Sequence, residues 1–138
     1  MIFWDATAIV PLLLAEPATA HVRALLAKDH ELVVWWGAST ECSSAIMRAR
    51  RSGKLSDADA RTARETLAAL EGAWYEIQPS GAVRDQAARL LRVHTLRAAD
   101  ALQLAAALEW AGSPPAGAIV TFDERLRAAA DSEGMETP

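Results

Sequence analysis

The chain contains 138 residues, 51% of them apolar, with 14 basic and 18 acidic side chains and a net charge of −4. This length suits one domain spanning residues 1–138, and the large apolar fraction excludes an intrinsically disordered chain. No apolar run approaches the roughly 18 residues needed to cross a bilayer, and the N-terminus lacks the features of a signal peptide. The single cysteine, Cys42, excludes an internal disulfide, so we expect a cytoplasmic protein without membrane contacts.

Strand-like and helix-like segments alternate along the chain. A strand at 2–5 precedes helices at 6–16, which Pro17 closes, and at 19–28. A strand at 32–36 precedes a helix at 38–51 and another, capped by Ser56, that runs to residue 70. A strand at 74–78 precedes helices at 82–94 and 98–111. A strand at 118–122 precedes a helix at 124–130, and residues 135–137 are predicted as an edge strand.

The predicted strands are apolar throughout rather than alternating, and helices separate them. Such strands are typical of a parallel sheet that is covered on both faces. The expected fold class is therefore α/β, a three-layer α/β/α sandwich around a mostly parallel sheet of four to five strands. Four of the five tryptophans (Trp4, Trp35, Trp36 and Trp74) lie in strand-like runs, so we expect them in the core. Trp110, near a helix end, is expected at a protein interface.

Four acidic residues stand beside apolar segments, where an unpaired buried carboxylate is unfavourable. Asp5 and Asp123 follow the first and last predicted strands, and two more acids fall near the starts of helices, Glu41 and Asp100. In parallel α/β sheets ligands bind beyond the carboxyl ends of the strands, and helix N-termini there favour negative charge. We therefore expect the four acids to meet at one rim of the sheet.

These acids have no obvious basic partner in their own segments, which indicates a bound divalent cation. Ligands that are all oxygen suit Mg²⁺, with Mn²⁺ as a substitute, better than Zn²⁺. Such an ion can activate water for attack on a phosphodiester and neutralise the charge that develops. The sequence has no phosphate-binding glycine loop, so it gives no support to nucleotide-cofactor chemistry.

Four segments resemble PIN-domain proteins, and more narrowly the VapC-type toxins of bacterial toxin–antitoxin pairs. They read, in order, Ile-Phe-Trp-Asp-Ala-Thr-Ala, Thr-Glu-Cys-Ser-Ser-Ala-Ile-Met-Arg, Ala-Ala-Asp-Ala-Leu-Gln-Leu-Ala-Ala-Ala and Val-Thr-Phe-Asp-Glu-Arg-Leu. The resemblance covers the chain from its start to about residue 138. It implies a PIN-like fold and a Mg²⁺- or Mn²⁺-dependent endoribonuclease. It also implies inhibition by a cognate antitoxin protein, and a homodimer.

Carried over by position, the resemblance implies a set of catalytic metal ligands, Asp5, Glu41, Asp100 and Asp123. Asp123 would either bind the ion directly or act through water. Two hydroxyls fall where the family supports its site, Thr7 and Thr121. The plain alternatives are a helix cap for Thr7 and an ordinary strand residue for Thr121.

Two basic residues, Arg48 and Arg97, are expected to contact RNA phosphates. Arg48 follows Glu41 by seven residues, which is two turns along one helix face. It belongs to a basic cluster that also contains Arg50, Arg51 and Lys54. Arg97 ends a second basic series that begins at Arg84. The alternative is that both groups are solvated faces, or that they dock an acidic antitoxin segment.

Two other classes of function fit part of the pattern. A non-catalytic PIN-like binding module would act through RNA or protein contacts alone, and it would have no reason to keep four acids. A receiver-type phosphotransfer domain also places acids at strand ends, but it needs a lysine after a strand. The only lysines, Lys28 and Lys54, do not follow one. The prediction is therefore metal-dependent cleavage of RNA.

Overall fold

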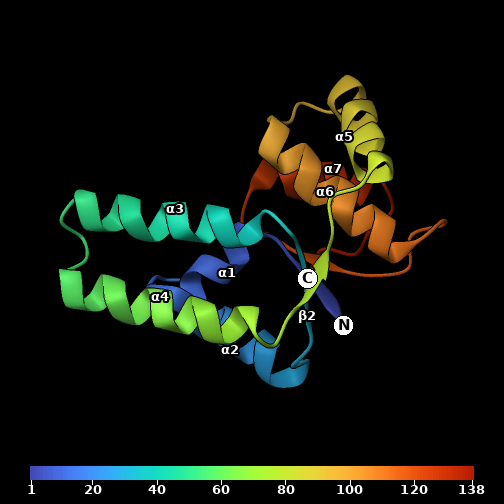
Figure 1. Ribbon diagram of the computed structural model, residues 1–138. Coiled ribbons are helices and arrows are strands. Elements are labelled where there is room, and N and C mark those ends of the chain that lie inside the picture. The colour runs from blue at the N-terminus through green and yellow to red at the C-terminus, as the bar shows by residue number, and fades with distance from the viewer.

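The computed structural model describes residues 1–138 as a four-stranded parallel sheet with helices on both faces (Figure 1). The strand order is β3-β2-β1-β4. In chain order the elements are β1 (Ile2–Trp4), α1 (Ala6–Leu13), α2 (Thr19–Lys28), β2 (Leu32–Trp35), α3 (Ala38–Arg51), α4 (Asp57–Glu71), β3 (Tyr75–Ile77), α5 (Gly81–Val93), α6 (Ala98–Ala111), β4 (Ile119–Val120) and α7 (Glu124–Ser132). The predicted α/β/α architecture is confirmed.

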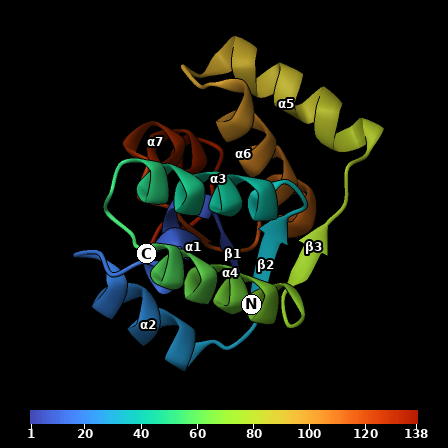
Figure 2. The same ribbon diagram turned by 60° about the vertical axis from the view of Figure 1, so that its left-hand side comes forward.

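Two hydrophobic cores lie on the two faces of the sheet, because successive residues of a strand point to opposite sides. One core packs strand residues against α5, α6 and α7, and its strand members are Phe3, Val33, Trp35 and Ile119. The other packs strand residues against α1 to α4, and its strand members are Trp4, Leu32, Val34 and Val120. Figure 2 shows α3 and α4 on one side of β2, with α5 and α6 beyond it. Coverage of both faces explains why the strands are apolar throughout.

The sheet reverses its strand order at β1. The chain moves from β1 to β2 and β3, and then returns to place β4 on the other side of β1. A topological switch point therefore lies between the carboxyl ends of β1 and β4, where α/β folds bind ligands. Asp5 follows β1 at this point, and Thr121 and Asp123 follow β4.

The end of α1 corrects the sequence prediction. The helix stops at Leu13 rather than at residue 16, and Leu14 is extended. Pro11 lies inside the helix, where its ring removes one backbone donor. The Thr19 hydroxyl, five residues beyond Leu14, donates to the backbone oxygen of Pro11 at 2.7 Å, so a side chain satisfies a carbonyl at the helix end.

The C-terminal edge strand and one tryptophan also differ from expectation. Residues 135–137 form only a single parallel bridge, between Glu136 and Ala118. Trp36 follows β2 and is 53% exposed, because β2 ends at Trp35 and the chain turns there into α3. Trp110 is partly buried, with its ring 6.4 Å from that of Phe3. No helix has the length and apolar character that a membrane crossing requires.

Candidate active site

Asp5 is the most buried acid of the chain and has no basic partner. Its side chain caps α1, and the residue is 3% exposed. Its Oδ2 atom accepts hydrogen bonds from the Thr121 hydroxyl at 2.9 Å, from the backbone N–H of Thr7 at 3.3 Å and from the Thr7 hydroxyl. Burial raises the pKa of Asp5, and the two threonine hydroxyls oppose that rise.

The same two threonines join the start of α1 to the end of β4. The Thr7 hydroxyl oxygen accepts a hydrogen bond from the Phe122 N–H at 2.9 Å, and that of Thr121 accepts one from the Asp123 N–H at 3.1 Å. Asp123 then caps α7, since its Oδ1 accepts from the Leu126 N–H at 2.8 Å. The segment that carries Asp123 is therefore fixed relative to Asp5 by hydroxyl groups at the switch point.

Glu41 lies in the first turn of α3 and accepts a hydrogen bond from a residue that the sequence analysis missed. Gln103, on α6, is fully buried, and its Nε2 donates to Glu41 Oε1 at 3.0 Å. The amide oxygen of Gln103 has no partner. Burial first, and then the charge of Asp5, raise the pKa of Glu41 to about 7. The only sequence signal was a polar side chain in the most apolar predicted helix.

Asp100 occupies the first turn of α6, where its Oδ2 accepts from the backbone N–H of Arg97 at 3.4 Å. Burial and the neighbouring charge of Asp123 raise the pKa of Asp100. Arg97 and Arg125 act in the opposite direction, so both guanidinium groups lie near this carboxylate. Arg125 is exposed and was also missed by the sequence analysis, although it belongs to the segment Thr-Phe-Asp-Glu-Arg-Leu.

The four predicted acids act on one another electrostatically. The charges of Asp5 and Asp100 both raise the pKa of Glu41, and that of Asp123 raises the pKa of Asp100. Their side chains do not, however, place any three acidic, histidine or cysteine groups close enough together to hold one ion. The donors are all carboxylates around one switch point, and this donor set suits a hard divalent cation.

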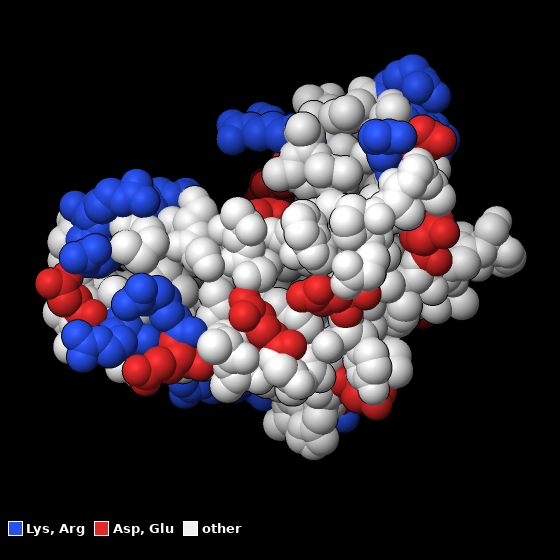
Figure 3. Space-filling model, viewed as in Figure 1, with Lys and Arg blue, Asp and Glu red and all other residues white.

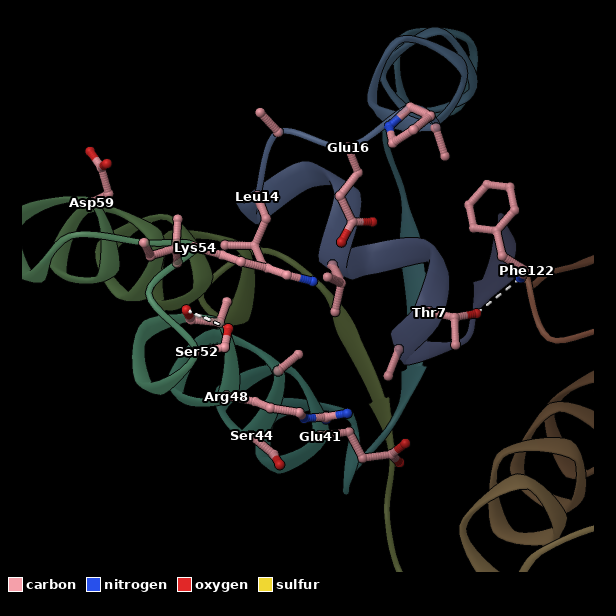
Figure 4. A pocket seen from close by; sticks show the side chains of 18 of the residues that line it. Thr7, Leu14, Glu16, Glu41, Ser44, Arg48, Ser52, Lys54, Asp59 and Phe122 are labelled. Carbon is pink, nitrogen blue, oxygen red and sulfur yellow. Dashed lines mark hydrogen bonds between the residues drawn. The ribbon is translucent and has the colours of Figure 1, made fainter.

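An open groove begins at the rim and runs along α3 (Figure 4). Its volume is about 1440 Å³. At one end it is lined by Thr7, Glu41, Phe122 and Asp123, and further along by Arg48, Ser52 and Lys54. Arg48 and Lys54 extend into the hollow between α3 and α1, and Glu41 lies at one end of it (Figure 4). Arg97 does not line this groove but stands near Asp100.

The family of the chain follows from comparison with known proteins. The PIN domain model matches residues 2–132, nearly the whole chain. The chain therefore belongs to the PIN domain family.

Individual relatives agree with this assignment. Ribonuclease VapC45 and ribonuclease VapC49, from two strains of Mycobacterium tuberculosis, are each 28% identical to it over 134 residues, which is 97% of this chain and 92% of theirs. Among solved structures, FitAcB from Neisseria gonorrhoeae superposes with a TM-score of 0.70 at 17% identity, covering 99% of this chain and 96% of the other. VapBC2 from Rickettsia felis, in a structure bound to a DNA fragment from its promoter, superposes with a TM-score of 0.67 at 13% identity. The match covers 100% of this chain and 98% of the other. These two structures share the fold.

Proposed function

We propose that this chain is the toxin of a type II toxin–antitoxin pair and acts as a metal-dependent endoribonuclease. Its PIN-like ribonuclease domain would span residues 1–138 and work in the cytoplasm. The observation that carries the proposal is the rim at the switch point, where four carboxylates act on one another electrostatically and two of them, Glu41 and Asp123, line a groove with basic side chains. The names of the VapC relatives, both ribonucleases, support the same reaction.

The residues that would hold Mg²⁺, or Mn²⁺ in its place, are Asp5, Glu41, Asp100 and Asp123. A bound cation would offset the mutual repulsion of these carboxylates and so stabilise their placement at one rim. The bound ion would supply an activated water and neutralise charge on the phosphodiester. Asp123 would either bind the ion or hold its water molecules through the free part of its carboxylate.

The chain's own groups would orient the site and the substrate. Thr7 and Thr121 hold Asp5 in one orientation, and Gln103 holds Glu41. Arg48, two turns from Glu41 along α3, would bind a substrate phosphate within the groove. Arg97 would bind a phosphate near Asp100, since its charge already acts on that carboxylate.

The partner would be a cognate antitoxin, and the toxin itself would be a homodimer. Part of the groove wall is apolar, and Val10, Leu14, Pro17 and Leu55 contribute to it. Such a wall suits the apolar side of an antitoxin helix. An antitoxin seated there would cover the carboxylate rim and exclude RNA.

The test is cleavage of total cellular RNA by the purified protein in Mn²⁺, in Mg²⁺ or in EDTA. The wild type is compared with Asp100→Asn and with a matched control, Asp85→Asn, which alters an exposed acid on α5. We expect defined fragments from the wild type and the control, and none from Asp100→Asn or in EDTA. Mapping the fragment ends would then identify the RNA target.

Two results would overturn the proposal. Cleavage that survives both EDTA and Asp100→Asn would show a contaminating nuclease. A folded wild-type protein that binds Mn²⁺ and RNA but cleaves nothing would instead be the non-catalytic binding module.

A further inference from the structure

Basic residues concentrate at one end of the hairpin formed by α3 and α4. Residues 48–64 contain six basic and two acidic side chains, a formal charge of +4 in a chain whose net charge is −4. The basic residues are Arg48, Arg50, Arg51, Lys54, Arg61 and Arg64, and all six are exposed. A local excess of this size, against the sign of the whole molecule, is the electrostatic signature of a polyanion-binding surface.

This end of the hairpin projects away from the sheet. Figure 1 shows α3 and α4 running side by side out to a turn that lies far from β2. The side chains around that turn are predominantly blue in Figure 3. We call the part formed by Arg50, Arg51, Arg61 and Arg64 the basic tip.

Most of these charges are not neutralised within the protein. Arg50 is the only one of the six that forms an ion pair, with its Nε 2.6 Å from Asp57 Oδ1. Arg61 and Arg64 project from successive turns of α4 and border a hollow of about 210 Å³ together with Arg50. Free guanidinium groups on neighbouring turns suit phosphate oxygens, which they can bind in bidentate fashion.

The turn end of the hairpin, where the basic tip lies, is separated from the carboxylate rim by much of the length of α3. Glu41 and Arg51 lie ten residues apart on α3, which corresponds to about 15 Å along the axis at the rise of an α-helix. The groove that starts at Glu41 and Asp123 follows α3 past Arg48 to Lys54. An RNA that follows the groove to Lys54 would therefore reach the basic tip by passing round the end of the hairpin, since Arg50, Arg61 and Arg64 border a separate hollow.

We propose that the basic tip is a second RNA-binding surface, which holds phosphodiester groups of the substrate away from the bond that is cut. The inference rests on the proposed ribonuclease function. Phosphate is favoured over a protein partner because the surface lacks an apolar anchor. Residues 48–64 include none of the large exposed hydrophobic side chains of the chain, whereas protein interfaces centre on such residues.

Arg61→Gln/Arg64→Gln tests this surface, because both residues lie on α4 and outside the groove. Arg23→Gln/Lys28→Gln is the control, since it removes two exposed charges from α2, which lie outside both hollows. Both pairs are made in Asp100→Asn, so that bound RNA stays intact. Fluorescence anisotropy measures binding of a labelled single-stranded RNA of about 24 nucleotides and of a tetranucleotide, which is too short to join rim and tip, over a range of salt concentrations.

We expect the tip variant to bind the long RNA about tenfold more weakly and to lower its salt slope by about 1.4, the value for two lost single-strand phosphate contacts. Binding of the tetranucleotide and the behaviour of the control pair should not change. In the cleaving protein, KM for the long RNA should rise while kcat stays the same. Thermal melts of each variant verify that it is folded.

Unchanged binding of the long RNA would overturn the inference, as would an equal loss for the tetranucleotide or for the control pair. A polyglutamate peptide serves as a further probe. If the tip variant loses that peptide but keeps RNA, the surface binds an acidic protein segment instead. Binding is measured without cleavage, so the two proposals fail separately. If the tip variant loses RNA binding but the wild-type protein cuts no RNA, the proposed function is refuted and the RNA-binding surface stands.

Discussion

At the scale of single residues, the acids of the rim are carboxylates whose ionised form is disfavoured by burial. Asp5 is almost fully buried, and its charge and that of Asp100 both act on Glu41. Each of the three has a pKa raised chiefly by burial. The metal-free protein is therefore expected to be less stable when these groups are ionised.

Glu41 gives this expectation a pH window. Its pKa is about 7 in the folded protein against an ordinary value of 4.5. Its contribution to the free energy of unfolding is therefore fully present below pH 4.5 and is lost as pH rises through 7. Because the side chain is partly exposed, we expect a loss of about 1–2 kcal/mol. Urea denaturation in EDTA at several pH values measures it. Glu41→Gln should flatten the slope, and an unchanged slope would contradict a raised pKa.

Gln103 is the residue whose role the structure adds. Gln103→Leu removes the hydrogen bond to Glu41 Oε1 and also a buried amide oxygen without a partner. We expect kcat and Mn²⁺ affinity to fall by about 10-fold or more, as for other residues that orient a metal ligand, while the melting temperature changes little. Metal titration and steady-state kinetics measure the two effects. A lower melting temperature with unchanged kcat and metal affinity would show that Gln103 serves packing only.

At the scale of elements, one carboxylate ties the end of α5 to the end of α7. Glu133 accepts hydrogen bonds from Arg89 Nη2 at 2.5 Å and interacts with His94 Nε2 at 2.7 Å. The hydrogen bond from Arg89 lowers the pKa of Glu133. Its stabilising effect is therefore present above pH 4.5 and is lost as pH falls further.

Glu133→Gln should accordingly lower the free energy of unfolding by about 1 kcal/mol at pH 7, a value reduced by the exposure of Arg89. The difference from the wild type should shrink under acid conditions, where both proteins lack the charge. Glu109→Gln, which alters an exposed acid on α6, is the matched control. A difference that persists at low pH would point to packing rather than to the ion pair.

At the scale of the whole molecule, stability should respond to metal. Mg²⁺ or Mn²⁺ is expected to raise the melting temperature. An ion present at 100 times its Kd stabilises the folded protein by about 2.7 kcal/mol. Asp5→Asn should melt higher than the wild type in EDTA, because an uncharged amide replaces a buried carboxylate, and it should gain less from metal. Differential scanning calorimetry tests both effects. If neither occurs, the acids do not share a site.

The sequence by itself determined the layers and the placement of the acids. Continuous apolar strands require cover on both faces, and this rule led to the parallel sheet and to a rim after residues 4 and 122. The pattern is local, so it set helix ends less well. The sequence pattern predicted that α1 ends before Pro17, but the helix ends at Leu13. The Thr19 hydroxyl donates to the backbone oxygen of Pro11 there, a contact that no local pattern predicts.

Only the tertiary structure decided which groups meet. Gln103 and Glu41 lie 62 positions apart, and Thr121 and Asp5 lie 116 apart, so no local pattern couples them. Trp36 is exposed although its strand-like run is otherwise buried, because the sheet ends one residue earlier. Buried polar side chains require partners, and these partners come from distant parts of the chain. The return of β4 beside β1 brings Thr121 to Asp5, and α6 brings Gln103 to Glu41.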